Sequence, residues 1–424
     1  MKLKSKTFGI TLSFILLMTF NLSAQGLSLS GYARNYTGVL LNDTNNYSIL
    51  QNTFNLNLEH KQDNVAFKIN PLIYQYANED PVFGIREAYL DIFFNSMDFR
   101  IGKQQIIWGK ADGVFITDIV SPKNLDEFLL PDFDEIRIGT TSLKANYYHG
   151  NSAFELVLIP AFTSTKLAEA PSIWARTPDF PESVEIVNDY SNKTIDQSLE
   201  NSEAFLKFSG VSSLIDYELM AGYAWDDDPT MYITPEFGVV NGAPGLTKVT
   251  LAPEHNRLSI LGASTSADVM GYVIRTEAAY YSGKNFSAVN ATSLPFDILE
   301  KDYIHYLIGT DFSMGETKLS AQFMQEYILD YDDVIVQPEQ SNMATFLANR
   351  SFINETLTLQ LLTYYDITNE DALIRPTISY DLSDGFEILG GANIFMAGIN
   401  NDYTSYFGYF DDNDMVYLKL KYSF

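Results

Sequence analysis

The chain has 424 residues and is acidic: it contains 54 Asp and Glu and 27 Lys and Arg, which gives a net charge of −27. A chain with this charge is not expected to bind nucleic acid, because such binding depends on Lys and Arg that neutralise phosphates. It contains no Cys, which excludes a disulfide framework, a thiolate nucleophile and a zinc–thiolate site. The fold must therefore be stable without covalent cross-links.

The first 24 residues have the features of an export signal. A basic head with three Lys precedes an apolar core over residues 8–20, and a small-residue cleavage site ends at Ala24, before Gln25. The apolar core is too short to span a bilayer as a helix. Cleavage near Ala24 would leave 24 Lys and Arg against 54 acids, a net charge of −30. We therefore expect residues 1–24 to be removed and residues 25–424 to form the mature, exported protein.

The mature chain alternates apolar and polar residues from end to end. Its 29 Phe and 27 Tyr are spread evenly, and neither a helical period nor an apolar run of about 20 residues interrupts the alternation. Length alone would suggest two or three domains, but no change of composition marks a boundary. Alternation, abundant aromatic residues and an export signal are typical of a bacterial outer-membrane β-barrel. The predicted fold class is therefore all-β, a single antiparallel transmembrane barrel over residues 25–424.

The last strand shows the alternation most clearly. Its apolar face consists of Val416, Leu418, Leu420, Tyr422 and Phe424. The other face carries Lys419 and Lys421. A terminal aromatic residue with apolar partners at every second position resembles the signal that barrel-assembly machinery recognises, so Tyr422 and Phe424 are the expected assembly signal. The alternative is a soluble edge strand that happens to end in Phe, but such strands rarely keep five alternations with two inward Lys.

Short and long connections alternate along the chain, as expected when one rim of a barrel faces the periplasm and the other the exterior. The long connections are residues 42–46, 77–83, 110–135, 163–201, 226–254, 283–301, 329–341, 369–371 and 397–411. Nine hairpins give 18 strands, and sixteen remains open because the segment 342–350 is a weak strand. A barrel of this size is too wide for side chains to fill, which predicts an aqueous lumen.

The stretch from residue 99 to residue 160 carries a recognisable set of residues around the third long connection. They are Gly102, Gln104, Trp108-Gly109, Ser121-Pro122, Asn124, Pro131, Arg137, Tyr147-Tyr148 and residues 156–160. This set resembles a porin-like bacterial outer-membrane family of unknown function, similar in plan to alginate-export and substrate-specific porins. Two positions depart from the family pattern: Lys110 stands where an acid is frequent, and Ser121 replaces Asn before Pro122. The resemblance implies an outer-membrane channel without catalytic chemistry.

In a porin the third outer loop folds inward and narrows the channel, and residues 110–135 are expected to do so here. The residues expected at this constriction are Asp118, Asp126, Glu127, Asp132, Asp134, Arg100, Lys103 and Arg137. Acids on the loop facing bases on the wall would create a transverse field, which favours dipolar or zwitterionic solutes. The alternative is that Arg100 and Arg137 only pair with acids and fix the loop in place.

The base of this loop and the strand before it complete the predicted site. Trp108, Gly109 and Pro122 are expected at the loop base. Two orientations of the strand over residues 98–108 remain open. In one, Asp98, Arg100 and Gln104 face the lumen; in the other, a bulge at Gly102 turns Arg100 and Lys103 inward together. No continuous row of Arg or Lys is evident along the wall, so a path for phosphate-like or alginate-like anions is not favoured.

The sequence favours transport over catalysis. It has four His and no nucleophile-elbow, zinc-protease or phosphate-loop motif, so no catalytic residue, cofactor or metal ligand is predicted. Acid clusters in the outer loops could bind calcium, but solvated loop tips are the favoured explanation. The predicted function is passive diffusion of small hydrophilic solutes. The alternatives are a specific conduit for lipid, hydrocarbon or polysaccharide, and a plugged barrel that binds a partner at its surface. Expected partners are outer-membrane lipid, barrel-assembly machinery and a small solute; a homo-oligomer is left open.

Overall fold

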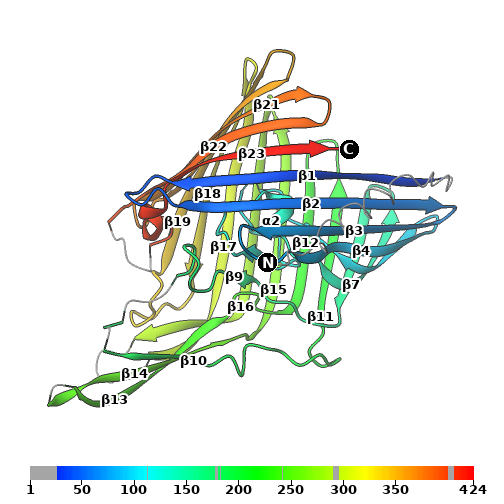
Figure 1. Cartoon of the computed structure of the whole chain (residues 1–424). Coiled ribbons are helices and arrows are strands. Elements are labelled where there is room, and N and C mark those ends of the chain that lie inside the picture. The colour runs from blue at the N-terminus through cyan, green and yellow to red at the C-terminus, as the bar shows by residue number, and fades with distance from the viewer. Residues whose placement is uncertain are drawn as a thin grey trace, which may run out of the picture.

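The computed structural model describes residues 26–111, 113–176, 180–181, 183–240, 242–289, 296–399 and 405–424. The predicted export signal and its cleavage site lie outside these residues. The described residues form a β-barrel with a small attached sheet (Figure 1). The barrel strands are β1 (Leu27–Leu40), β2 (Tyr47–Gln62), β3 (Val65–Tyr76), β4 (Val82–Phe93), β5 (Met97–Gln104), β7 (Thr140–His149), β8 (Ser152–Ile159), β11 (Glu203–Val211), β12 (Asp216–Trp225), β15 (Arg257–Val269), β16 (Tyr272–Val289), β17 (Phe296–Met314), β18 (Thr317–Ile328), β19 (Gln340–Phe352), β20 (Leu357–Asp366), β21 (Asp371–Ser383), β22 (Phe386–Met396) and β23 (Met415–Ser423).

The barrel is closed by its first and last strands. β1 pairs with β23 in a regular antiparallel register, from Tyr32 opposite Ser423 to Leu40 opposite Met415. Each of the other strands pairs with its neighbours in chain order, so the described residues contain an 18-stranded closed sheet. The prediction of 18 strands is confirmed. The segment 342–350, expected to be weak, lies within β19, which pairs along its length with β18 and β20.

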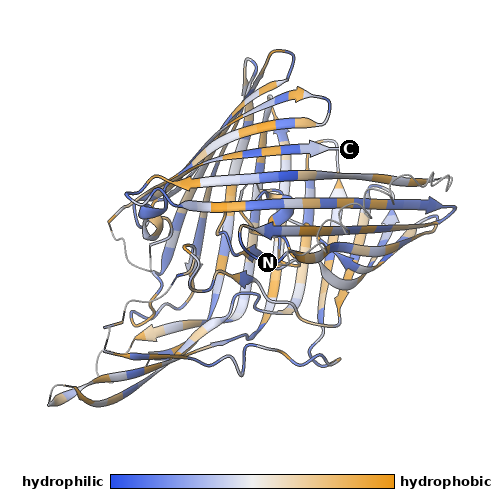
Figure 2. Cartoon of the chain, viewed as in Figure 1, coloured by the Kyte–Doolittle hydropathy of each residue, from blue (hydrophilic) through white to orange (hydrophobic). Residues whose placement is uncertain are grey.

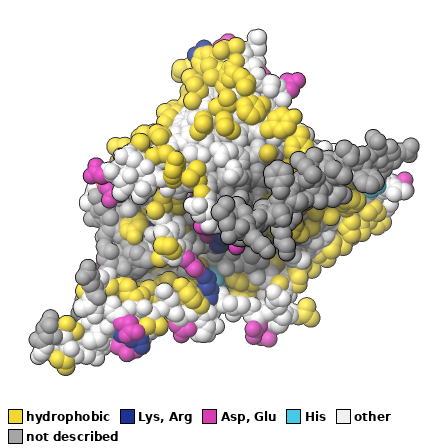
Figure 3. Space-filling view, viewed as in Figure 1, with side chains coloured by type: hydrophobic (Ala, Val, Ile, Leu, Met, Phe, Trp, Pro, Cys, Tyr) yellow, Lys and Arg dark blue, Asp and Glu magenta, His cyan; other side chains and the backbone are white. Residues whose placement is uncertain are grey.

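Alternation separates a lipid-facing surface from a lumen-facing one, as the pleat of a strand requires. On β23, Val416 and Leu418 are each 43% exposed on the outside, whereas Met415 and Tyr417 are buried on the inside. Figure 2 shows the same alternation as bands of opposite hydropathy along the barrel strands. Hydrophobic side chains also cover much of the upper surface in Figure 3, where Figure 1 places β21 and β22.

Two of the predicted loops contain more strand than expected. Residues 226–254 include a long hairpin of β13 (Thr230–Val240) and β14 (Ala243–Glu254), which is joined in parallel by β10 (Glu185–Asn188). These three strands extend away from the barrel at the lower left of Figure 1. The predicted loop 283–301 is mostly the outer ends of β16 and β17, which remain paired beyond a bulge. These strands were not predicted because they continue beyond the hydrocarbon layer, where neither face of a strand has to be apolar and the alternating pattern is lost.

The remaining elements are short and lie in the outer loops. They are β6 (Asn124–Leu125), α2 (Phe133–Ile136), β9 (Lys166–Leu167) and the 3-10 helix η1 (Gly408–Asn413). Within the described residues, no helix has the length and apolar character needed to cross a membrane. β6 and β9 form a small parallel pair, which joins the third outer loop to the fourth.

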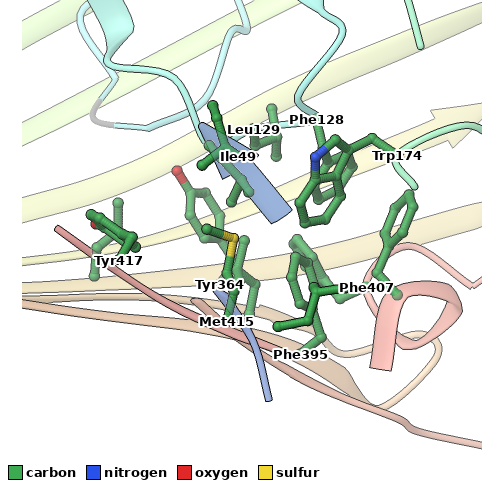
Figure 4. Close-up of a cluster of buried hydrophobic side chains, with 14 of the residues drawn as sticks. Ile49, Phe128, Leu129, Trp174, Tyr364, Phe395, Phe407, Met415 and Tyr417 are labelled. Atoms are coloured by element: carbon green, nitrogen blue, oxygen red, sulfur yellow. The ribbon is translucent and has the colours of Figure 1, made fainter. Parts of the chain in front are cut away.

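An aromatic cluster packs three outer loops together near the closing strands. Phe128 from the third loop and Trp174 from the fourth converge on Phe395 of β22 (Figure 4). Phe410 from the last loop packs against all three rings. Arg176 adds a polar connection, because its guanidinium donates to two carbonyls of the last loop and lies over the rings of the cluster. The third, fourth and last outer loops therefore pack together as one unit.

The C-terminal residue is tied directly to the closing seam, which leads to a prediction. The N–H and the carbonyl of Phe424 both hydrogen bond to Gly31, each at 3.0 Å, and its ring stacks on Phe54. We expect Phe424→Ala to slow folding and to lower the folded fraction, because the substitution removes an aromatic contact worth about 1 kcal/mol at the last strand to pair. The folded fraction is measured by gel mobility without heating. Phe346→Ala, on the outer face of β19, is the matched control; equal losses in both variants would contradict a special role for Phe424.

Candidate functional site

The third outer loop, residues 105–139 (hereafter loop 3), enters the barrel and binds its far wall through its first half. The carboxylate of Glu277, on β16, accepts hydrogen bonds from the N–H of Lys110 at 2.6 Å and the hydroxyl of Thr117 at 2.6 Å. Tyr364, on β20, donates its hydroxyl hydrogen to the carbonyl of Gly113 at 3.0 Å. Glu277 is 2% exposed. Its buried negative charge is thus stabilised by groups of the loop, as burial of a carboxylate requires.

The second half of loop 3 binds the wall near the closing seam. Its contacts are Tyr76 with Glu127 (2.6 Å), Arg375 with the carbonyls of Leu129 and Leu130 (both 2.8 Å), Lys419 with Asp132 (3.0 Å), and Arg34 with Glu135 (2.9 Å). Arg86 of β4 also reaches Glu135, at 3.2 Å. These partners lie on β1, β3, β4, β21 and β23, so loop 3 crosses the lumen from one wall to the other.

An ion pair inside loop 3 joins its two halves. The guanidinium of Arg137 donates to the carboxylate of Asp118 at 2.6 Å and to the carbonyl of Phe133 at 2.8 Å. The N–H of Trp108 donates to the other oxygen of Asp118 at 3.2 Å. The side chain of Asp118 is only 1% exposed. This pair therefore fixes the loop itself, the alternative that the sequence left open for Arg137.

The residues predicted at the loop base lie against the wall or within the loop. Trp108 is buried, and its indole N–H donates to Glu155 of β8 at 2.5 Å while its ring packs edge-on against Phe205. Gly109 lies close to Asp118: a Cβ atom at position 109 would be 3.2 Å from the Cβ atom of Asp118. The carbonyl of Pro122 accepts a hydrogen bond from the N–H of Ile138 at 2.7 Å. Trp108 therefore anchors the start of loop 3 to the wall, and Pro122 binds the end of the loop.

The open orientation of β5 is decided by its register. Pairing with β4 and β7 runs without a shift through Gly102, which has a φ of +129° that favours glycine. Gln104 is fully buried, so it shares the inner face with Arg100, and Lys103 points to the opposite face. Arg100 binds Asp91 of β4 at 2.7 Å. The structure therefore does not bring Arg100 and Lys103 to the acids of loop 3.

The other predicted acids of the loop differ in their surroundings. Asp126 pairs with Lys166 of β9, in the fourth outer loop. Asp134 is exposed. Burial raises the pKa of Glu127 above its ordinary value, and the hydrogen bond from Tyr76 offsets this only in part. Burial also raises the pKa of Asp132 and Glu135, but a neighbouring cation outweighs it in each case. Lys419 holds the pKa of Asp132 below its ordinary value, and Arg34 does the same for Glu135.

The bases that bind acids or carbonyls of loop 3 were not predicted at this site from the sequence. They are Arg34, Arg86, Arg375 and Lys419. Lys419 was expected to face inward, but strands at opposite ends of the chain become neighbours only when the barrel closes. Four strands, β1, β4, β21 and β23, place these bases around one segment of loop 3. Among the described residues, no group of three acidic or His side chains is arranged to hold a metal ion.

Loop 3 separates two cavities. The larger, of about 430 Å³, lies between loop 3 and the wall from β15 to β20, and its lining includes Tyr281, Tyr303 and Glu326. The smaller, of about 320 Å³, lies between loop 3 and the wall formed by β1 to β4 and β23, with Arg34 and Lys419 in its lining. Loop 3 thus has a cavity on each of its two sides.

No protein-family model matches the sequence, and no curated protein matches it either. Solved structures match in fold. OccAB1 of Acinetobacter baumannii gives a TM-score of 0.55 at 9% identity, over 94% of this chain and 96% of that one. OccK2 (OpdF) of Pseudomonas aeruginosa, solved with glucuronate, gives 0.53 at 8% identity over 94% and 96%. The outer membrane protein OpdK of the same species gives 0.52 at 8% identity over 94% and 99%, and was also solved with vanillate. The chain has the fold of outer-membrane porins, which confirms the predicted resemblance at that level.

The Asp118–Arg137 pair gives a testable prediction. Arg137→Met leaves a buried carboxylate without its partner, which costs about 3–5 kcal/mol. We expect loop 3 to loosen while the barrel stays folded, seen as faster hydrogen–deuterium exchange of the amides of residues 106–137. Arg350→Met is the control, because it breaks an exposed pair with Glu316 worth at most about 1 kcal/mol. Unchanged exchange in Arg137→Met would show that the pair does not fix the loop.

Proposed function

We propose that the protein is an outer-membrane channel for passive diffusion of small hydrophilic solutes, and that loop 3 sets its size limit. The observation that carries this proposal is the path of loop 3, which binds β16 on one wall and β1, β3 and β23 on the other. A barrel of this size encloses an aqueous lumen, and a loop fixed across it leaves only narrow passages. Cleavage of residues 1–24 and delivery to the outer membrane belong to the same proposal, as does the absence of catalytic chemistry.

The distribution of charge on the two sides of the lumen supports the proposal that the channel conducts dipolar solutes. Around the second half of loop 3 the wall carries Arg34, Arg86 and Lys419, whereas the opposite wall carries Glu218, Glu277 and Glu326. Separated charges of opposite sign create a field across the pore, which orients zwitterions and disfavours apolar solutes. The proposed constriction includes Asp126, Glu127, Asp132 and Asp134 from loop 3.

A carboxylate-bearing solute is a second candidate within the same class. Four bases gather near Asp132 and Glu135, and an anionic solute could replace a loop acid as their partner. Two structures of similar fold were solved with carboxylate compounds, glucuronate and vanillate. Reversal potentials with sodium glucuronate against sodium chloride would separate this candidate from a channel without anion preference.

Removal of the loop tests the size limit. We expect deletion of residues 110–134 to raise single-channel conductance severalfold in a planar bilayer, because it removes the chain that crosses the lumen. The control deletes residues 230–254, an equal length of chain in the β13–β14 hairpin, whose ends are already paired in register. Conductance that stays the same after the first deletion would contradict the constriction.

The raised pKa of Glu127 predicts a pH effect. Glu127 takes up a proton at a higher pH than Asp132 and Glu135, whose pKa values are lowered, so it is the first of the three to lose its charge as the pH falls. We expect selectivity to shift toward anions as the pH falls from neutral, at a higher pH than an ordinary Glu would give, measured as the reversal potential in a salt gradient. Glu127→Gln should remove this step, and Tyr76→Phe should move it to higher pH. Asp126→Asn is the matched control; a step that persists in Glu127→Gln would assign it to another group.

A further inference from the structure

The larger cavity beside loop 3 has an excess of acidic side chains. Its acids are Asp118, Asp226, Asp227, Asp228, Glu326 and Asp366, and its bases are Lys123, Lys284 and His305. Asp118 is neutralised by Arg137, and Asp226 by Lys284 at 2.6 Å. Lys123 lies over the ring of Phe115. Within the described part of the chain, Asp227 and Asp228 form no ion pair, and Glu326 has only His305, at 3.8 Å.

Asp227 is another carboxyl group of this cavity that has no ion-pair partner among the described residues. It belongs to the outer loop after β12 and lines the cavity. Burial raises its pKa well above the ordinary value, and Lys123 offsets this only in part. A cation bound beside this carboxyl group would favour its charged form, because a nearby opposite charge lowers the pKa of a carboxyl group. The cavity thus offers a place where a bound cation would be stabilised.

Aromatic rings form another part of the same wall. Tyr281 and Tyr303, on β16 and β17, stack with ring centroids 4.6 Å apart and an angle of 15° between their planes. The ammonium group of Lys284 lies 5.7 Å from the centroid of Tyr303 while it pairs with Asp226. The chain therefore already places one alkylammonium against a ring and a carboxylate here. Rings beside carboxylates are the usual surroundings of bound organic cations.

We propose that this cavity is a binding subsite for an organic cation, an amine with an apolar or aromatic body that pauses there as it crosses the barrel. Its volume of about 430 Å³ lies within the range of small-molecule sites. Tyr303 contacts the body of the ligand, and Asp227, Asp228 and Glu326 bind the ammonium group. The inference rests on the proposed channel function and adds a class of solute to it.

The smaller cavity supports the assignment by contrast. It is lined by Arg34, Arg86, Lys166 and Lys419, and these bases pair with acids of loop 3. The two faces of loop 3 therefore differ in the charge that they leave available. The smaller cavity also contains four acids, Glu79, Asp126, Glu127 and Glu135, so acids are in excess only on the face toward β17 and β18.

The test compares three probes of similar shape and different charge: phenethylammonium, 2-phenylethanol and phenylacetate. Each is added to the side of the long loops while single-channel current is recorded in a planar bilayer. Phenethylammonium should interrupt the current most often, and the double variant Asp228→Asn with Glu326→Gln should weaken its apparent affinity about tenfold, or roughly 1.4 kcal/mol. Asp333→Asn, which removes an acid from an exposed loop tip, should leave the affinity unchanged.

Calorimetric titration of the folded barrel in detergent measures the same binding without current. If the barrel does not conduct, the channel function fails, yet tight phenethylammonium binding that the double variant weakens would still support the subsite. If the barrel conducts and calorimetry detects no binding of phenethylammonium, the subsite fails and the channel stands. Equal responses to the three probes, a preference for phenylacetate, or an affinity that the double variant does not change would also overturn the proposal.

Discussion

The structure depends on one constraint, the need of every backbone N–H and C=O within a hydrocarbon layer to find a partner inside the protein. A single sheet meets this need only when its first and last strands pair, as β1 and β23 do. Eighteen strands within the described residues then enclose a space that wall side chains cannot fill. The interior must therefore be occupied by something else, and loop 3 is the part of the chain that enters it.

Loop 3 is held in the lumen mainly by charged and hydrogen-bonded contacts. Its buried acids and carbonyls are matched by groups on the wall, and the wall acid Glu277 is matched in turn by the loop. An unpaired charge in such a place is expensive, so the contacts specify one position of the loop rather than a range of positions. Apolar packing contributes near the outer end, where Phe128 joins the aromatic cluster with Trp174 and Phe410.

Much of the fold could be predicted because alternation is a local property. The last strand and the weak strand at residues 342–350 were assigned from neighbouring residues alone, and the strand count followed from the connections. The partners across the lumen could not be assigned in this way. Arg34 and Lys419 flank the same loop acids, yet they lie at opposite ends of the chain, and alternation states only whether a side chain faces inward, not at which angle around the barrel. Trp108 could be placed near the loop base because Gly109 follows it, whereas its partner Glu155 gave no signal.

The pairing of the first strand with the last has a consequence in time. Tyr32 reaches its partner Ser423 only after the chain has been made through β23, so an intermediate without β23 cannot close the sheet in this way. Until then two open edges with unsatisfied backbone groups are exposed, and these are the surfaces on which strands of other chains aggregate. A chain that is cut before β23 lacks the edge that β1 requires, so its sheet stays open.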